Sequence, residues 1–276
     1  MSTKKYIISF IERLDEKNNW FFLLFSRPTL YLYNLLKRTF ITGIVLFVLY
    51  EIIKHLNIHD QPIPTSWHSS AGIVIGLLLV FRTNTAYDRW WEARKIFANI
   101  ESSFMYITIS CVSDVETKLS LIKINNDIFN YISNSAEKGS DKSKLSFLNN
   151  LSELKKRCCL LSKSEKISQQ EYSIMEKKIC DILESFTSLE RIKTTPIPIS
   201  YSFHIKISLF AYLLTLPFGL FFGFGWVAIP MVMVLFFIIA GIEIISNEIE
   251  NPFKGDPNDL PMDEFKNEIE KIIQQC

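Results

Sequence analysis

The stretch that decides the fold is Ser70–Arg94, which reads SAGIVIGLLLVFRTNTAYDRWWEAR. Its first half is uncharged and rich in small residues, whereas its second half is dense in Arg, Asp, Trp and Tyr. We interpret it as one helix that leaves a lipid bilayer without a break. Within the apolar half, Ile73, Leu77 and Phe81 recur every four residues and therefore share one face. This face either packs against another helix of the same chain or lines a pore that several copies of the chain surround.

The hydrophobic and charged residues separate along the chain instead of mixing. Of 276 residues, 48% are hydrophobic and 21% are charged. The run Ile207–Ile242 carries no formal charge, and it is longer than the ~20 residues that one membrane crossing needs. Its centre is rich in glycine and aromatic residues, which favours two crossings, Ile205–Phe222 and Trp226–Ile245, joined by a tight turn. One long kinked helix is the alternative.

A second pair of crossings is expected in the first half of the chain. Thr39–Tyr50 is uncharged, and His68–Phe81 is the apolar part of the deciding stretch. The prolines between them exclude a continuous helix. The fold class is therefore all-α, with four transmembrane helices and a large helical cytosolic domain. Assembly around a central pore is expected if the apolar face of Ser70–Arg94 lines it.

The distribution of Lys and Arg predicts the topology. The short loops around residues 55–68 and 219–226 contain neither, whereas the N-terminal 38 residues carry seven and residues 92–200 carry sixteen. Because positively charged loops stay in the cytoplasm, we expect a multi-pass protein of the inner (plasma) membrane with both termini cytoplasmic.

Five segments follow from these patterns: an amphipathic cytosolic helix within 1–38, a first helix pair in 39–91, a helical cytosolic region in 92–203, a second helix pair in 204–246 and a cytosolic tail in 247–276. Apolar residues recur at helical spacing in the third segment, and a loop is expected near Ser133–Ser143. These residues are Leu119, Ile122, Ile124, Leu148, Leu151, Leu154, Ile174, Ile179, Ile182 and Phe186.

The sequence offers little support for an enzyme. It contains no glycine-rich phosphate loop, no serine nucleophile elbow and no paired-carboxylate pattern. His55 and His59 have the spacing of two metal ligands, but no third ligand lies nearby. The adjacent Cys158 and Cys159 are interpreted as reduced thiols. Without such motifs we expect neither an enzyme nor a cofactor. The net charge of +1 gives no attraction to nucleic acid, so we expect no nucleic-acid partner either.

Two motifs resemble the signature of the bestrophin family in its bacterial branch. They are FRTNTAYDRWWEAR, from Phe81 to Arg94, and IENPFKGDPNDLPMD, from Ile249 to Asp263. The resemblance extends over nearly the whole chain, because the four crossings around the motifs also fit. It implies a homopentameric channel for small monovalent ions in the lipid bilayer, with cations such as sodium favoured in the bacterial branch and chloride conducted by animal relatives. A non-conducting membrane scaffold or sensor is the alternative from another class.

The resemblance also assigns residues to the pore. When the motif Arg89-Trp90-Trp91 is used as the anchor, the three apolar rings of the family's membrane neck fall on Ile73, Leu77 and Phe81, the same stripe that periodicity identifies. Apolar rings let a narrow pore gate by dewetting. The segment TTPIPISY places a second, cytosolic aperture at Ile197, or at Thr195 if the alignment shifts by two residues.

The polar residues of the first motif have a structural interpretation. We expect Arg82, Asp88, Arg89, Glu92 and Arg94 to anchor the helix to the cytosolic domain through ion pairs, with Arg89 and Glu92 as neighbours three residues apart. Asn84 belongs to the same motif, and Trp90 and Trp91 suit a membrane interface. A direct role of Arg82 in ion selectivity is the alternative.

The second motif corresponds to a calcium clasp in animal relatives, where Asn251, Asp256 and Asp259 fall at the matching positions. Hard oxygen ligands suit calcium, but Pro257 and Lys254 interrupt the acidic run. We therefore expect a structural turn after the last crossing, with calcium binding as the alternative.

Overall fold

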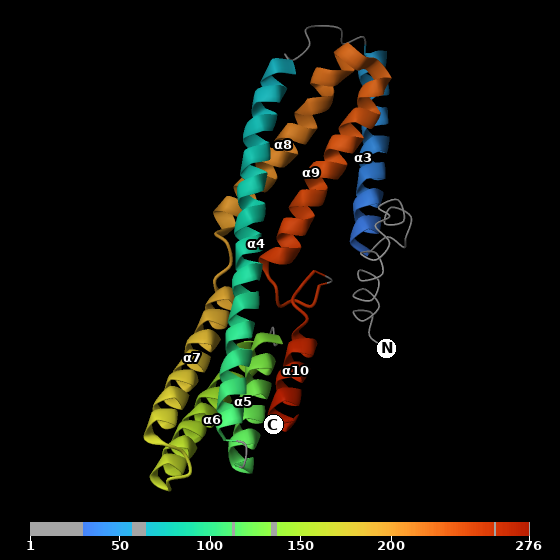
Figure 1. The fold of residues 1–276 in the computed structure, drawn as a ribbon. Coiled ribbons are helices and arrows are strands. Elements are labelled where there is room, and N and C mark those ends of the chain that lie inside the picture. Colours follow the sequence, from blue (N-terminus) through green and yellow to red (C-terminus); the bar gives the residue numbers. More distant parts are fainter. Residues whose placement is uncertain (1–29, 57–64, 112–113, 134–136, 257, 276) are drawn as a thin grey trace, which may run out of the picture. The chain divides into compact units, whose positions relative to one another are not determined.

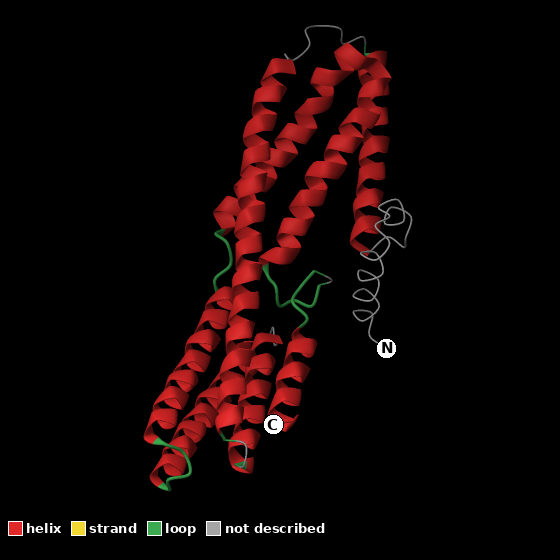
Figure 2. Cartoon of the chain, viewed as in Figure 1, coloured by secondary structure: helices red, strands yellow, loops and turns green. Residues whose placement is uncertain are grey.

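The computed structural model describes residues 30–56, 65–111, 114–133, 137–256 and 258–275, and all regular secondary structure in these ranges is helical (Figure 2). The all-α class is thus confirmed. The amphipathic helix expected near the N-terminus, His59 and most of the first outer loop lie outside the described residues.

Eight α-helices and one 3-10 helix make up the described chain (Figure 1). They are α3 (Leu30–His55), α4 (Thr65–Ser110), α5 (Val115–Ser133), α6 (Glu137–Lys163), α7 (Gln169–Thr194), α8 (Ile199–Phe224), η1 (Gly225–Val227), α9 (Ala228–Glu250) and α10 (Met262–Gln275). The Ser70–Arg94 stretch lies inside the single helix α4, as predicted.

The chain divides into two compact units. The apolar unit comprises Met1–Asn84 and Pro198–Ser246, and the polar unit comprises Thr85–Ile197 and Asn247–Cys276. Each unit therefore combines one part of α4 with segments that are distant in sequence.

Two stretches of the described chain are long and apolar enough to cross a membrane: Ser66–Ser110, which is most of α4, and Ile199–Glu250. The second is not one kinked helix, because η1 separates α8 from α9. Pro217 stays inside α8, and the break falls at Gly225, whose φ of 57° is the left-handed conformation that glycine adopts without strain. The tight turn predicted between two crossings is therefore present.

The apolar unit has two small interior clusters. Leu46 of α3 packs with Leu216 and Phe221 of α8 and with Ala228 and Val232 of α9. Leu79 of α4 packs with Ile205 and Leu209 of α8. Most other large apolar side chains of these helices are exposed in the single chain, as expected for surfaces that meet lipid or further copies.

The polar unit has one continuous core. Within α4 the buried positions Ala93, Phe97, Ile100, Phe104 and Ile107 recur every three or four residues, so one face of this helix packs onto the others. The helix α7 begins at a capping box, in which Ser168 and Glu171 bond each other's backbone N–H groups.

Two details differ from the sequence-based expectation for this region. Leu119, Leu148 and Ile174 are exposed, because helical spacing alone does not say which apolar face is covered. The expected loop near Ser133–Ser143 is shorter, since α6 begins at Glu137.

Candidate functional site

The predicted neck residues lie along one exposed face of α4. Ile73, Leu77 and Phe81 are 75%, 54% and 53% exposed in the single chain. Leu79, on the other side of the helix, is only 4% exposed because it packs on α8. The stripe is therefore not covered by another described helix of its own chain, which was the alternative interpretation.

The predicted aperture residues occupy the segment between α7 and α8. Ile197 is 6% exposed in the single chain. Thr195 is exposed, and its carbonyl oxygen accepts a hydrogen bond of 2.8 Å from Arg89 Nη1. Of the two candidates, Thr195 is thus the more accessible, and Ile197 is largely covered.

Arg82 pairs with a carboxylate of the apolar unit. Its guanidinium is fully buried inside the apolar unit, where Nη1 lies 3.2 Å from Oε1 of Glu243 on α9. One residue further on, the hydroxyls of Thr83 and Ser246 are 2.7 Å apart. These contacts join α4 to α9, and Glu243 supplies the carboxylate that a buried cation requires.

Arg89 holds three segments of the polar unit together through backbone carbonyl groups and not through an ion pair with Glu92. It donates to the carbonyl oxygens of Ile192 (2.7 Å), Thr195 (2.8 Å) and Glu250 (3.2 Å). The five donors of a planar guanidinium suit such a junction. These partners are backbone carbonyl groups, whereas the sequence led us to expect ion pairs.

Its neighbours make further contacts within the polar unit. The indole N–H of Trp90 donates to the carbonyl oxygen of Asn258, and Trp90 packs on the core. Glu92 pairs with Arg191 at 2.6 Å, and the Arg94 guanidinium lies 4.7 Å from the ring centre of Phe265. Asn84 and Asp88 are exposed.

The second motif forms a turn between α9 and α10 that Asp259 holds. Its Oδ2 accepts the backbone N–H groups of Gly255 (2.6 Å) and Asp256 (2.7 Å), and Asn251 Oδ1 accepts that of Phe253. Gly255 has a φ of 90°. No group of three or more metal-ligating side chains occurs in the described ranges.

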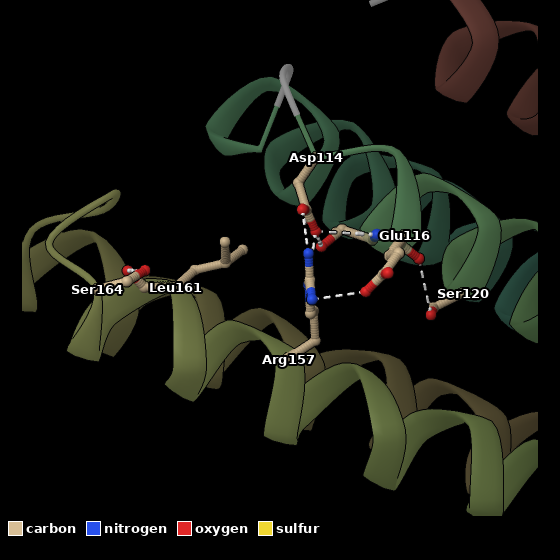
Figure 3. Close-up of polar contacts among 7 residues, drawn as sticks. Asp114, Glu116, Ser120, Arg157, Leu161 and Ser164 are labelled. Carbon is tan, nitrogen blue, oxygen red and sulfur yellow. Dashed lines mark hydrogen bonds and ion pairs between the residues drawn. The ribbon is translucent and has the colours of Figure 1, made fainter.

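A polar cluster lies at the start of α5, and no pattern in the sequence predicts it. Arg157 of α6 contacts Asp114 at 2.5 Å and 2.9 Å, and it also reaches Glu116 at 2.5 Å (Figure 3). The Arg157 hydrogen bonds hold the pKa of Asp114 well below its usual range against the opposing effect of burial, and bonds from Thr117 lower it further. Asp114 and Arg157 thereby join α5 to α6.

Two cysteines of the polar unit, Cys111 and Cys158, are buried in its core. Burial raises the pKa of the Cys158 thiol to about 12 and that of Cys111 to about 11. Both thiols are therefore protonated at neutral pH and behave as small core residues.

Comparison with known proteins identifies the family. The family model described as bacterial and fungal bestrophin protein matches residues 12–114 and 99–275. A Nostoc protein named as a voltage-dependent anion channel-forming protein is 32% identical, over 93% of this chain and 91% of its own. A Synechocystis protein of the same name is 31% identical, over 73% of this chain and 75% of its own.

A solved structure shows the same fold. It is a mutant of a bacterial bestrophin homologue from Klebsiella pneumoniae, with a TM-score of 0.76 and 19% identity, over 90% of this chain and 98% of its own. The sequence matches extend over nearly the whole chain and include both motifs. This chain therefore belongs to the bacterial and fungal bestrophin family of membrane channel proteins.

Proposed function

We propose that the chain is one subunit of a homopentameric channel for small monovalent ions, with Ile73, Leu77 and Phe81 as its hydrophobic neck. The observation that carries the proposal is the exposure of this stripe along α4, on the face opposite the one that packs on α8. Symmetric copies placed with these faces inward turn three exposed side chains into three apolar rings. A narrow apolar constriction opposes ion passage because water leaves it readily.

The neck is tested by Leu77→Ser. A small polar side chain removes one apolar ring, so we expect the conductance in planar bilayers to rise several-fold. Leu214→Ser on α8 is the matched control, because Leu214 is also 54% exposed and we place it toward lipid. An unchanged conductance in Leu77→Ser, or an equal increase in the control, would count against the neck.

Separate observations favour an anion and a cation as the conducted ion. The names of the Nostoc and Synechocystis relatives favour anions. The bacterial spelling of the two motifs favours cations such as sodium. Since the apolar rings carry no formal charge, the neck itself does not decide between them. The reversal potential under a sodium chloride gradient, measured with the purified protein, reports the sign directly.

We further propose that the protein lies in the inner membrane with both termini in the cytoplasm, and that ions leave past an aperture formed at Ile197 or Thr195. The positive-inside distribution of Lys and Arg supports this orientation. Ion flux through liposomes that contain only this protein distinguishes a channel from a non-conducting scaffold. A scaffold gives no ion flux in the wild type or in variants with alanine at the three neck positions.

A further inference from the structure

One side of α4 is covered along the helix, and the opposite side is not. A series of buried residues recurs at intervals of seven: Leu79, Ala86, Ala93, Ile100 and Ile107. A second series with the same interval is exposed at every position: Phe81, Asp88, Lys95, Ser102 and Ile109. Because each residue turns a helix by about 100°, the two series lie on nearly opposite sides of α4. We refer to the second as the exposed series.

The exposed series begins in the neck. Its first member, Phe81, is also the last residue of the stripe that starts at Ile73 and Leu77. Since α4 is one continuous helix from Thr65 to Ser110, a side of it that faces a pore axis at Phe81 faces the same way at Asp88, about two turns further on. The distance along the helix axis between these two residues is about 10 Å.

Asp88 is the first residue with a formal charge on this side of α4 after the neck. Asn84 and Thr85, which come between, are polar and uncharged. Arg82 is buried, and Arg89 points its guanidinium at backbone carbonyl groups of the polar unit. An ion that leaves the apolar rings on the exposed side of α4 therefore meets the Asp88 carboxylate first.

The Asp88 side chain does not hold the fold together. It is exposed, and within the part of the chain that the structure describes no residue forms a hydrogen bond or an ion pair with it. Its neighbours in the motif do have such partners, because Arg89 and Trp90 donate to carbonyl groups and Glu92 pairs with Arg191. The negative charge of Asp88 is therefore available to act on a passing ion.

We propose that Asp88 tunes the ion preference of the pore: one carboxylate from each copy forms a ring just beyond the neck, which attracts cations and repels anions. The inference rests on the proposed channel function and deepens it. Rings of acidic side chains favour cations in channels. Lys95, the next member of the exposed series, carries the opposite charge but lies about 20 Å beyond Phe81, so it acts more weakly on an ion at the neck.

The test is the reversal potential of the purified protein in planar bilayers under a sodium chloride gradient. Asp88→Asn removes the charge with little change in size, and we expect it to lower the sodium-to-chloride permeability ratio by at least about twofold. Asp88→Lys inverts the charge and should lower the ratio further, whereas Asp88→Glu keeps the charge and should retain the wild-type ratio. The direction of these shifts is the same whichever ion the wild type prefers, because the ring adds to any other determinant.

Glu101→Gln is the matched control on the same helix. Glu101 is an acidic residue of α4 that lies about 140° around the helix axis from Asp88, so the loss of its charge should leave the ratio unchanged. Salt dependence provides a second measure. The screening length falls from about 10 Å at 0.1 M salt to about 3 Å at 1 M, so the shift caused by Asp88→Asn should shrink at high salt.

The outcomes are separable. A lower ratio in Asp88→Asn that shrinks at high salt and that Asp88→Glu does not reproduce supports the inference. Ion flux with an unchanged reversal potential in Asp88→Asn, an equal shift in Glu101→Gln, or a shift that persists at 1 M salt overturns the inference and leaves the channel in place. Absence of flux from the wild type overturns the proposed function and the inference with it.

Discussion

At the scale of single residues, Asp114 and Arg157 form an ion pair with two hydrogen bonds, of 2.5 Å and 2.9 Å. We expect Asp114→Asn to lower the free energy of unfolding by about 1–3 kcal/mol, because it removes a charged acceptor shared by Arg157 and the first turn of α5. Thermal denaturation in detergent, followed by circular dichroism at neutral pH, measures the loss.

The pH dependence of this effect has a definite sign. The pKa of Asp114 is lowered in the folded protein, so its stabilisation is present above the ordinary aspartate pKa of about 4 and is lost as the pH falls toward the folded value. The difference between wild type and Asp114→Asn should therefore be smaller at pH 3 than at pH 7. Glu116→Gln is the control, since Glu116 contacts the same arginine but is 70% exposed, and it should cost less than about 1 kcal/mol. Equal losses in the two variants would contradict this account.

At the scale of elements, the turn between α9 and α10 depends on one carboxylate. Asp259→Ala removes the acceptor of two backbone N–H groups, and we expect a loss of about 1.5–3 kcal/mol with faster amide exchange at Gly255 and Asp256. Hydrogen–deuterium exchange of a peptide spanning 251–262 measures this. Asp256→Ala, whose side chain takes no part in these two bonds, is the control. Calcium-dependent protection of the wild-type turn would instead favour the clasp.

The helices and turns can be predicted from the sequence, whereas the contact partners of individual side chains cannot. The uncharged run Ile207–Ile242 and its glycine-rich centre were sufficient to predict two helices and a turn, because the bilayer and the backbone impose those limits directly. The partners of Arg89 were missed, since Thr195 and Glu250 are more than a hundred residues away and offer carbonyl groups that every residue has. The partner of Arg82, Glu243, is likewise 161 residues away in the sequence, and no local pattern indicates it.

At the scale of the whole molecule, the exposed stripe of α4 predicts contacts between copies. Five copies of the 32.1 kDa chain are expected in mass photometry of the detergent-solubilised protein. Oxidation of a Leu77→Cys variant should yield disulfide-linked dimers, because equivalent side chains face one another around a narrow axis. Leu79→Cys is the matched control on the same helix, since Leu79 is buried against α8 within its own chain and its thiol cannot reach a second copy. The wild type, which has free cysteines of its own, sets the background. A monomeric mass, or equal cross-linking at both positions, would mean that α4 does not turn its exposed face toward a common axis. Ile73, Leu77 and Phe81 would then not line a pore.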